Sequence, residues 1–204
     1  MSVRLVLASG SPRRAEILAM LGIAHDVRSS EVDERLLPGE LPAVAARRLA
    51  EEKATAAGAD ARGPVLAADT IVALGDEALG KPADAAEAEA MLARLSGREH
   101  EVFTGLALLR DGRMASGVER TRVRFRSLAP REPAEYVATD EALDKAGAYG
   151  IQGRGAALVE RIEGDYFNVV GLPVRLLLSL LDRQGLRYDF AGLEVASDDA
   201  GTGR

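Results

Sequence analysis

The chain has 204 residues, of which 47% are hydrophobic, enough to bury one substantial core or two small lobes that share an interface. Its 26 basic and 32 acidic residues give a formal net charge of −6, which argues against a general affinity for nucleic acid or anionic membranes. The absence of cysteine and the presence of only two histidines, His25 and His100, exclude disulfides, thiolate chemistry and histidine-ligated zinc. Any metal ligands should therefore be oxygens, which suit Mg²⁺ or Mn²⁺, and both histidines are interpreted as structural or surface residues.

The N-terminal residues predict a strand, a turn and a helix in close succession. Residues 4–8 indicate a short buried strand, and Ser9-Gly10-Ser11-Pro12 supplies a turn, a helix N-cap and a first-turn proline for a helix over residues 13–21. The apolar run is too short for a signal peptide, and no apolar stretch of the chain approaches the roughly 20 residues needed to span a bilayer. We therefore expect a cytoplasmic protein without a membrane-spanning segment.

A second helix and a central strand follow. The helix is predicted over residues 42–57, with Val44, Ala45, Leu49 and Ala56 on its apolar face. Residues 65–74 are rich in β-branched and aliphatic side chains and indicate a central strand with Asp69 in its middle. An ionised carboxylate in an apolar strand is unfavourable unless it meets a cation, hydrogen-bond donors or a metal. Asp69 is therefore the first candidate for a functional residue.

The second half of the chain combines a hairpin with further helices. Asp111-Gly112 is the strongest hairpin signal, and Thr-Arg-Val-Arg-Phe-Arg over residues 121–126 alternates as a strand with one solvated face does. The remaining predictions are a helix opened by Asp84 and Glu87 that runs to Gly97, strands over 101–110 and 113–126, a short helix over 133–139, a strand over 157–162 and a helix over 173–184. Together these elements predict a mixed α/β fold with parallel and antiparallel strand pairs, in one domain over residues 1–195 with a disordered polar tail over 196–204.

The segment from Ser9 to Arg14 is the first candidate binding site. A strand end, a flexible turn and a helix N-terminus present free backbone N–H groups and a positive dipole end, where anions bind readily. The Ser9 hydroxyl adds a donor, and Arg13 can grip phosphate oxygens with two parallel hydrogen bonds. A capped helix with two solvated arginines explains the segment equally well on its own, because it has no P-loop or GxGxxG spacing.

Carboxylates elsewhere in the chain could complete such a site. Asp69 could deprotonate a water molecule or hold a hard divalent ion; the alternative is a buried aspartate that accepts hydrogen bonds from loop N–H groups. Glu31, Asp33 and Glu34 form an acidic cluster that could add metal ligands or could simply be solvated. The sequence around these carboxylates does not decide between the functional and the structural role of Asp69, or between metal binding and solvation of the acidic cluster.

Two lysines and the glycine-rich stretch over residues 147–155 provide further candidates. Lys53, from a helix, and Lys81, from a Gly-Lys-Pro turn, are candidate phosphate partners, although a lone lysine is usually solvated. Tyr149, Gln152 and Asn168 lie in or near glycine-rich segments, where backbone can approach a ligand closely. Gln152 offers both a donor and an acceptor, which suits it to recognise a base edge.

The motifs taken together resemble those of Maf proteins over residues 3–185. The motifs that carry the resemblance are LASGSPRRAEIL from Leu7, EVDE from Glu31, AEEKA ending at Ala54, AADTIV from Ala67, GKP at Gly80, LSGREHEVFTG from Leu95, DKAGAYGIQG from Asp144 and GDYFNVVGLP from Gly164. The resemblance implies an elongated α/β fold with two lobes around a central cleft, related to that of inosine triphosphate pyrophosphatases. It also implies a catalytic domain that hydrolyses nucleoside triphosphates at the α–β linkage.

The resemblance further assigns roles to nine residues, which we call the predicted site residues. Asp69 is implied as the proton acceptor, and Glu34 as its partner in organising a Mg²⁺ or Mn²⁺ ion. The implied substrate-binding residues are Ser9, Arg13, Arg14, Lys53, Thr70, Lys81 and Gln152. Water activated by Asp69 would then attack the α-phosphorus in line, with pyrophosphate leaving.

Within the family, one branch acts on dTTP and UTP and another on 7-methyl-GTP. The segment AGAYGIQG, with its neutral Gln152, resembles the first branch, because an amide can pair with the O4 and N3–H edge that thymine and uracil share. A carboxylate at this position would instead suit a cationic methylated guanine. The family also implies a homodimer and leaves two alternatives open: hydrolysis of modified pyrimidine nucleotides, and a non-catalytic, nucleotide-responsive regulator of septum formation linked to cell division arrest.

Overall fold

The computed structural model describes residues 2–29 and 32–196, which form a mixed α/β fold. In chain order its elements are β1 (Leu5–Ala8), α1 (Pro12–Met20), β2 (His25–Val27), α2 (Pro42–Gly58), β3 (Val65–Leu74), β4 (Glu77–Leu79), α3 (Ala85–Leu95), β5 (Glu99–Arg110), β6 (Arg113–Phe125), α4 (Glu132–Val137), the 3₁₀ helices η1 (Ala146–Ala148) and η2 (Gly153–Leu158), β7 (Val159–Glu163), α5 (Tyr166–Val170), α6 (Val174–Arg183), β8 (Leu186–Tyr188) and β9 (Leu193–Val195). Within these ranges no helix is both long and apolar enough to cross a membrane. Glu31 of the acidic cluster and residues 197–204 of the predicted tail lie outside the described residues.

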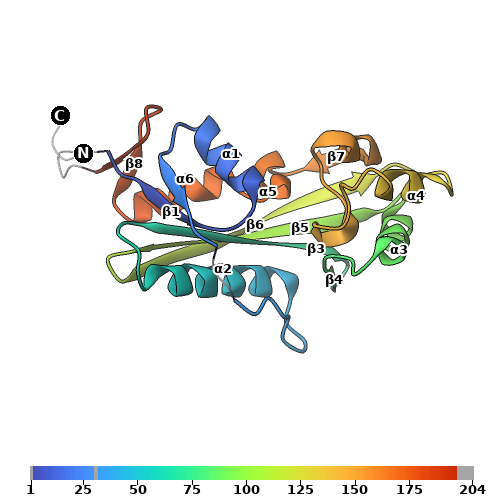
Figure 1. Ribbon diagram of the computed structural model, residues 1–204, viewed down its shortest axis with the longest axis horizontal. Coiled ribbons are helices and arrows are strands. Elements are labelled where there is room, and N and C mark those ends of the chain that lie inside the picture. The colour runs from blue at the N-terminus through green and yellow to red at the C-terminus, as the bar shows by residue number, and fades with distance from the viewer. Residues whose placement is uncertain (1, 30–31, 197–204) are drawn as a thin grey trace.

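One mixed sheet runs the length of the molecule (Figure 1). Its strand order is β2-β1-β3-β5-β6-β7, with β4 also paired to β3, while β8 and β9 form a separate pair. β1 pairs in parallel with β2 and β3, and the remaining pairs are antiparallel. The predicted class, an α/β fold with a mixed sheet, is confirmed.

The central strand β3 has one edge that is only partly paired. β5 pairs with residues 65–73 along one edge. On the other edge β1 pairs with residues 65–67 and β4 with residues 72–74. β1 ends at Ala8 because the chain turns into α1 there, so residues 68–71 lie between two short partners. Asp69 belongs to this open stretch of the edge.

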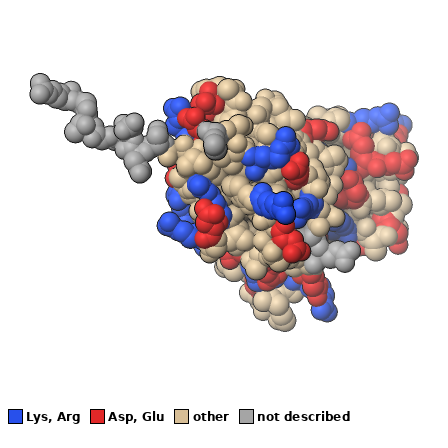
Figure 2. Space-filling model, turned by 60° about the vertical axis from the view of Figure 1, so that its left-hand side comes forward, with Lys and Arg blue, Asp and Glu red and all other residues tan. Residues whose placement is uncertain are grey.

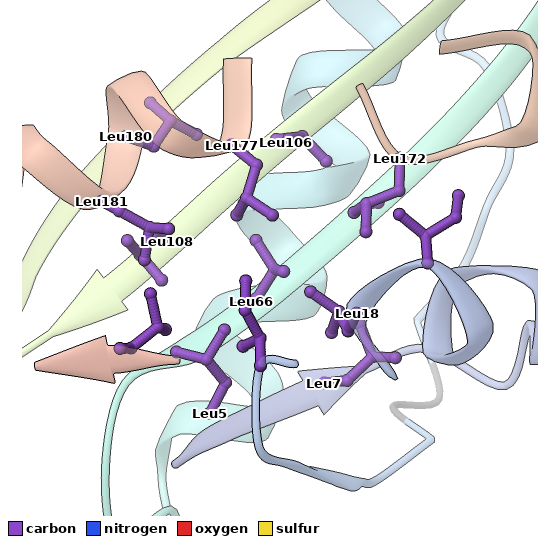
Figure 3. Packing of buried hydrophobic residues seen from close by; sticks show 14 of the residues in the cluster. Leu5, Leu7, Leu18, Leu66, Leu106, Leu108, Leu172, Leu177, Leu180 and Leu181 are labelled. Carbon is purple, nitrogen blue, oxygen red and sulfur yellow. The ribbon is translucent and has the colours of Figure 1, made fainter. Parts of the chain in front are cut away.

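Two hydrophobic cores at opposite ends of the long strands make the two lobes. The first packs side chains of β1, α1 and α6, such as Leu5, Leu18 and Leu177, against the sheet (Figure 3). The second packs α3 and α4 against the other end and contains Leu92 and Phe125. Figure 1 shows these helices over opposite ends of the same long strands. The elongated two-lobed shape agrees with the expectation from the sequence.

Helix α2 covers the opposite face of the sheet from α1 and α6 (Figure 1). It lies very close to the sheet because Gly105 of β5 has no side chain, and a Cβ there would lie 2.1 Å from the carbonyl oxygen of Ala46. The buried side of α2 also includes Leu49 and Lys53. The predicted buried face was partly wrong, since Val44 is 55% exposed and Ala56 is also exposed. An alanine-rich helix has little difference in hydrophobicity between its faces, so its residue pattern does not show which face packs on the sheet.

The long elements agree with the sequence predictions, as do the short β1, α4 and β7, whereas the remaining short strands and α5 were missed. β3 has the predicted bounds, Asp111-Gly112 connects β5 to β6, and the Asp84 carboxylate caps α3 by accepting from the N–H of Glu87 at 2.9 Å. The strands β2, β4, β8 and β9 have three residues each and α5 has five. Segments of this length contain too few residues to show a periodic pattern.

Candidate active site

A cleft of about 750 Å³ lies between the two lobes, over the open edge of β3. It is lined by the turn between β1 and α1, by the middle of β3, by the turn after β4 and by residues from the segment 141–153. All nine predicted site residues line this cleft. Residues that are up to 143 positions apart in the sequence, from Ser9 to Gln152, are thereby brought to one place.

The buried centre of the cleft is a lysine between two carboxylates. The ammonium of Lys53 lies 2.6 Å from Asp69 Oδ1 and 2.6 Å from Glu34 Oε1. The side chains of Lys53 and Asp69 are only 8% and 11% exposed. The charge of Asp69 in an apolar strand is therefore explained by an ion pair with α2, rather than by hydrogen bonds from loop N–H groups.

Glu34 connects this pair to a second lysine at the mouth of the cleft. Lys81 Nζ lies 3.8 Å from Glu34 Oε2, and both side chains are substantially exposed. Burial by itself raises the pKa of Glu34, but the hydrogen bond from Lys53 and the charges of Lys53, Lys81 and Arg14 hold that pKa below its usual value. Glu34 is thus kept as an anion surrounded by cations.

The turn between β1 and α1 provides an anion site of the predicted kind. Ser11 is the N-cap residue of α1, but within the described residues no side chain caps the first turn of this helix. The Ser9 oxygen accepts hydrogen bonds from the N–H of Ser11 at 3.2 Å and from Arg14 Nη1 at 2.8 Å. Since both acceptor positions of the Ser9 hydroxyl are used, its own proton remains to be donated. The helix end and the hydroxyl therefore both offer donors to the cleft.

Arg14 holds the cleft wall together. Its guanidinium donates to Gly171 O at 2.8 Å, Ser9 Oγ at 2.8 Å, Ala68 O at 2.9 Å and Thr70 Oγ1 at 3.1 Å. The bond to Ala68 satisfies a carbonyl of the open edge of β3. Four of the five N–H groups of a guanidinium are thereby used within the protein, so the predicted contact of Arg14 with substrate rests on one remaining group.

Asp69 and Thr70 are neighbours whose side chains point to opposite faces of the sheet. Asp69 meets Lys53 of α2, whereas the Thr70 hydroxyl lies 3.1 Å from Arg14 Nη2 of α1 and 3.0 Å from Thr104 Oγ1. Both nevertheless line the cleft, because they lie on the stretch of β3 that is paired with β5 on one edge and has no strand on the other. The open edge thus gives one cavity access to side chains from both faces of the sheet.

The opposite wall of the cleft is a folded glycine-rich segment. Glu141 accepts hydrogen bonds from the N–H of Arg154 at 3.1 Å, and the N–H of Gly150 donates to the hydroxyl of Tyr136 at 3.2 Å. Gly155 packs so closely on this segment that a Cβ would lie 2.0 Å from Gly150 O. Gln152 projects from the segment exposed, and its side chain makes no hydrogen bond to the described residues. Its amide is therefore available to a ligand.

The model of the Maf-like protein family matches residues 4–184, the stretch that supplies every residue of this cleft. The chain belongs to the Maf-like protein family. Among its curated relatives, the protein of Moorella thermoacetica is 54% identical over 183 residues, 87% of this chain and 93% of that protein. The protein of Myxococcus xanthus is 53% identical over 184 residues (89% and 93%), and that of Syntrophomonas wolfei 50% over 182 residues (88% and 96%). All three are named dTTP/UTP pyrophosphatase.

Solved structures also align with this Maf-like chain at lower similarity. A HAM1 protein from Coxiella burnetii is 18% identical and covers 89% of this chain and 99% of its own, with a TM-score of 0.45. A nucleoside-triphosphatase, or dITP/XTP pyrophosphatase, from Mycobacterium abscessus is 18% identical and covers 61% and 75%, with a TM-score of 0.38.

Other residues that the sequence singled out have structural contacts. Asn168 is fully buried, and its amide donates to Val102 O at 2.9 Å and Thr121 Oγ1 at 3.0 Å. His100 is buried, as expected for a structural residue, and its Nε2 lies 2.7 Å from the hydroxyl of Tyr149. Asp33 of the acidic cluster pairs with Arg35 at 2.6 Å and does not line the cleft. Of the acidic cluster, Glu34 is the member that the described residues place in the cleft.

Three charged residues of the Maf cleft were not selected from the sequence. Glu141, Asp144 and Lys145 line the cleft wall opposite Ser9 and Arg13. A signal was available for Lys145, because it is one of only three lysines in the chain and stands inside the DKAGAYGIQG motif. Glu141 gave no signal, since its neighbours are ordinary residues of a helical and turn-forming stretch.

Proposed function

We propose that this Maf-like chain hydrolyses dTTP and UTP to the nucleoside monophosphate and pyrophosphate. The observation that carries the proposal is the buried Asp69, which lies in an open stretch of β3 beside Lys53, Glu34 and the uncapped end of α1. Relatives about half identical over nearly the whole chain are named for this activity. A carboxylate next to a cationic, donor-rich cleft is what hydrolysis of a phosphoanhydride requires.

In this proposal Asp69 accepts the proton of the attacking water. Its Oδ1 is held by Lys53 at 2.6 Å, while its other oxygen receives no hydrogen bond from the described residues and is left to act as the base. The water oxygen forms a bond to the α-phosphorus as the bond from that phosphorus to the bridging oxygen breaks. Pyrophosphate takes the electron pair of that bond and leaves, so no covalent enzyme intermediate is needed.

The cations of the cleft neutralise the triphosphate. Arg13, Lys53 and Lys81 supply full charges, and the free N–H groups of α1 and the Ser9 hydroxyl supply hydrogen bonds. Charge builds on the leaving pyrophosphate as the bond breaks, so groups already fixed around it stabilise the transition state more than the ground state. Arg14 keeps Ser9 and Thr70 in place for this purpose.

A divalent ion fits the chemistry of the donors present. Glu34 and Asp69 both lie 2.6 Å from a single cation, the ammonium of Lys53, which shows that one positive centre can contact both carboxylates. Mg²⁺ is usually bound by one or two carboxylates together with substrate phosphates, and among residues 2–29 and 32–196 no group of three or more acidic or histidine side chains is placed to hold a metal ion. We therefore assign Glu34 and Asp69 as the residues that would hold Mg²⁺ or Mn²⁺. The ion would supply positive charge to the phosphate oxygens.

Arg13, Thr70 and Gln152 are the residues proposed to select the pyrimidine. The exposed amide of Gln152 can donate to a base oxygen and accept from N3–H, which thymine and uracil share. Modified pyrimidines that keep this edge are proposed as further substrates. The homodimer implied by the family stays a prediction, which sedimentation of the purified protein tests.

The deciding experiment measures pyrophosphate release from dTTP, UTP, CTP, GTP, ATP, 7-methyl-GTP and modified pyrimidine triphosphates, each with Mg²⁺, Mn²⁺ or EDTA. We expect metal-dependent release from dTTP, UTP and pyrimidines that keep the O4 and N3–H edge. Turnover of 7-methyl-GTP alone would contradict the role of Gln152. No turnover of any nucleotide would exclude the proposed activity, and equal turnover in EDTA would exclude the metal.

A further inference from the structure

All the lysines of this chain line the cleft. Only three of its 26 basic residues are lysines, and all three, Lys53, Lys81 and Lys145, line the cleft. Arg13 and Arg14 are the other basic residues of the lining, and every basic residue elsewhere is an arginine. An ammonium is a compact point charge on a flexible stem and a guanidinium is a rigid planar fork, so the two are not equivalent at a binding site. Of the three lysines, Lys145 has so far no part in the proposed reaction.

The arginines outside the cleft are largely engaged in surface ion pairs. Arg122 Nη2, for example, lies 2.6 Å from Glu163 Oε1 on adjacent strands. Figure 2 shows basic and acidic side chains next to one another on one face of the molecule. These cations are balanced locally, as expected of a solvated surface. The lysines of the cleft also have carboxylate partners, and they differ from the surface arginines in residue type and in lining one shared cavity.

The ammonium of Lys145 is held in a fixed place with one donor left over. It donates to Glu141 O at 2.6 Å and to Asp144 Oδ1 at 2.6 Å, which uses two of its three N–H groups. The side chain is only 16% exposed. Its stem packs on Gly150, where a Cβ would lie 3.0 Å from the Cε of Lys145 and 3.1 Å from its Cδ. The absence of a side chain at position 150 thus makes room for Lys145 against the cleft wall.

The carboxylate of Asp144 lies between cations from both sides of the cleft. Its Oδ1 accepts from Lys145, and its Oδ2 lies 3.7 Å from Arg13 Nη1 of α1. Burial by itself raises the pKa of Asp144. The hydrogen bond from Lys145 and the charges of Lys145 and Arg13 outweigh this effect and hold the pKa below its usual value, so this carboxylate is a stable anion. An anion in contact with both a phosphate-binding arginine and Lys145 marks a place that a phosphate oxygen can occupy.

We propose, building on the proposed function, that Lys145 is a further phosphate-binding residue of the nucleotide site and that Asp144 is its resident counter-ion, which the substrate phosphate displaces. The triphosphate is then held from both walls of the cleft, by Arg13 on one side and by Lys145 on the other. Removal of Lys145 weakens every ligand that carries the phosphates. Removal of the Asp144 charge has the opposite effect, because it frees two cations for the ligand.

The first test compares Lys145→Met with Arg154→Met. Both variants remove one positive charge from the same segment, but the side chain of Arg154 is exposed outside the cleft lining. Calorimetry with inorganic pyrophosphate and with thymidine, in the presence of Mg²⁺, reports on phosphate and base contacts separately. We expect Lys145→Met to weaken pyrophosphate about tenfold or more and to leave thymidine unchanged, because one charged hydrogen bond is lost. Arg154→Met should bind both ligands as the unmodified protein does.

The second test is Asp144→Asn, which removes the charge of the counter-ion and leaves Lys145 unchanged. We expect it to bind pyrophosphate several-fold more tightly than the unmodified protein. Weaker or unchanged pyrophosphate binding by Asp144→Asn would overturn the counter-ion role, and a loss of thymidine binding alone in Lys145→Met would overturn the phosphate role. Failure of the unmodified protein to bind pyrophosphate would also overturn it. Because calorimetry needs no turnover, pyrophosphate binding that depends on Lys145 in a protein without dTTP hydrolysis would disprove only the proposed function.

Discussion

The two walls of the cleft are built in different ways. The strand wall, which consists of residues 8–14, Lys53 and residues 68–71, fixes its polar side chains by hydrogen bonds and ion pairs to one another and to the backbone. The glycine-rich wall, residues 141–153, is held by hydrogen bonds from backbone N–H groups to the side chains of Tyr136 and Glu141, and it leaves Gln152 exposed. Charges that are fixed before substrate arrives, in the strand wall and at Lys145, are suited to the reacting phosphates, whereas the exposed amide of Gln152 is suited to recognition of a base.

The largest expected effect tests the chemistry of the strand wall. Asp69→Asn removes the proposed base but keeps the shape of the side chain, so we expect turnover of dTTP to fall about 10³-fold or more. Pyrophosphate release measures the loss, and thermal unfolding checks that the fold is retained. Full activity in this variant would remove Asp69 from the mechanism and would leave the buried pair with Lys53 as a purely structural feature.

The adjacent arginines of the strand wall separate support of the wall from contact with substrate. Arg14→Ala removes four hydrogen bonds to the protein, and we expect the free energy of unfolding to fall by about 4 kcal/mol, since each such bond contributes about 1 kcal/mol net. Arg13→Ala removes one loose ion pair, to Asp144 at 3.7 Å, and should change stability by less than about 0.5 kcal/mol. Urea unfolding measures both changes.

The kinetics of Arg13→Ala test its contact with substrate apart from any effect on stability. Arg13→Ala is expected to raise the KM for dTTP about tenfold with the fold intact, because a charged contact to phosphate is lost. A large loss of stability in Arg13→Ala, with none in Arg14→Ala, would exchange the roles that the structure gives to these neighbours.

His100 tests the support beneath the glycine-rich wall, where its ring contacts Tyr149. Burial lowers the pKa of His100 to about 4, so in the folded protein it stays neutral at pH values at which the unfolded chain takes up a proton. Since the unfolded state binds more protons between pH 6.5 and about 4, stability falls as the pH is lowered through this window. We expect a loss on the order of 2 kcal/mol from this group between pH 7 and pH 5.

The comparison for His100 is the variant His100→Gln, which keeps a donor near the hydroxyl of Tyr149 but does not titrate. Urea unfolding at pH 7 and pH 5 should show a smaller loss of stability in the variant than in the unmodified protein. Equal losses in both proteins would show that His100 is not the source of the acid sensitivity between pH 7 and pH 5, because a paired carboxylate such as Glu132, whose pKa Arg126 lowers to about 2, loses its stabilisation only at lower pH.

The strand wall was also the part of the site that the sequence predicted best. Asp69 interrupts an apolar run and the Ser9 to Arg14 turn joins a strand to a helix, so both gave local signals that did not depend on tertiary structure. The family resemblance supplied the remaining site residues, and all of them line the cleft. The ion pair between Lys53 and Asp69 could not be predicted, because it depends on the close approach of α2 at Gly105.

The glycine-rich wall was harder to predict for a physical reason. Its conformation depends on contacts such as Glu141 with the N–H of Arg154 and Gly155 with Gly150 O, which join residues without any periodic pattern. The sequence therefore identified the segment but not which of its side chains point into the cleft. Lys145 was not predicted as a site residue for this reason, although it is one of only three lysines in the chain.

The smallest expected effect concerns the exposed amide of the glycine-rich wall. Gln152→Glu and Gln152→Leu should both lower kcat/KM for dTTP and UTP about tenfold, because the base loses one or two hydrogen bonds. Melting temperature should not change in either variant, since Gln152 makes no hydrogen bond to the described residues. The glutamate variant alone should gain turnover of 7-methyl-GTP, whose cationic base a carboxylate favours. A loss of activity without loss of stability assigns Gln152 to the base, whereas unchanged kinetics in both variants would leave substrate selection to the strand wall, through Arg13 and Thr70.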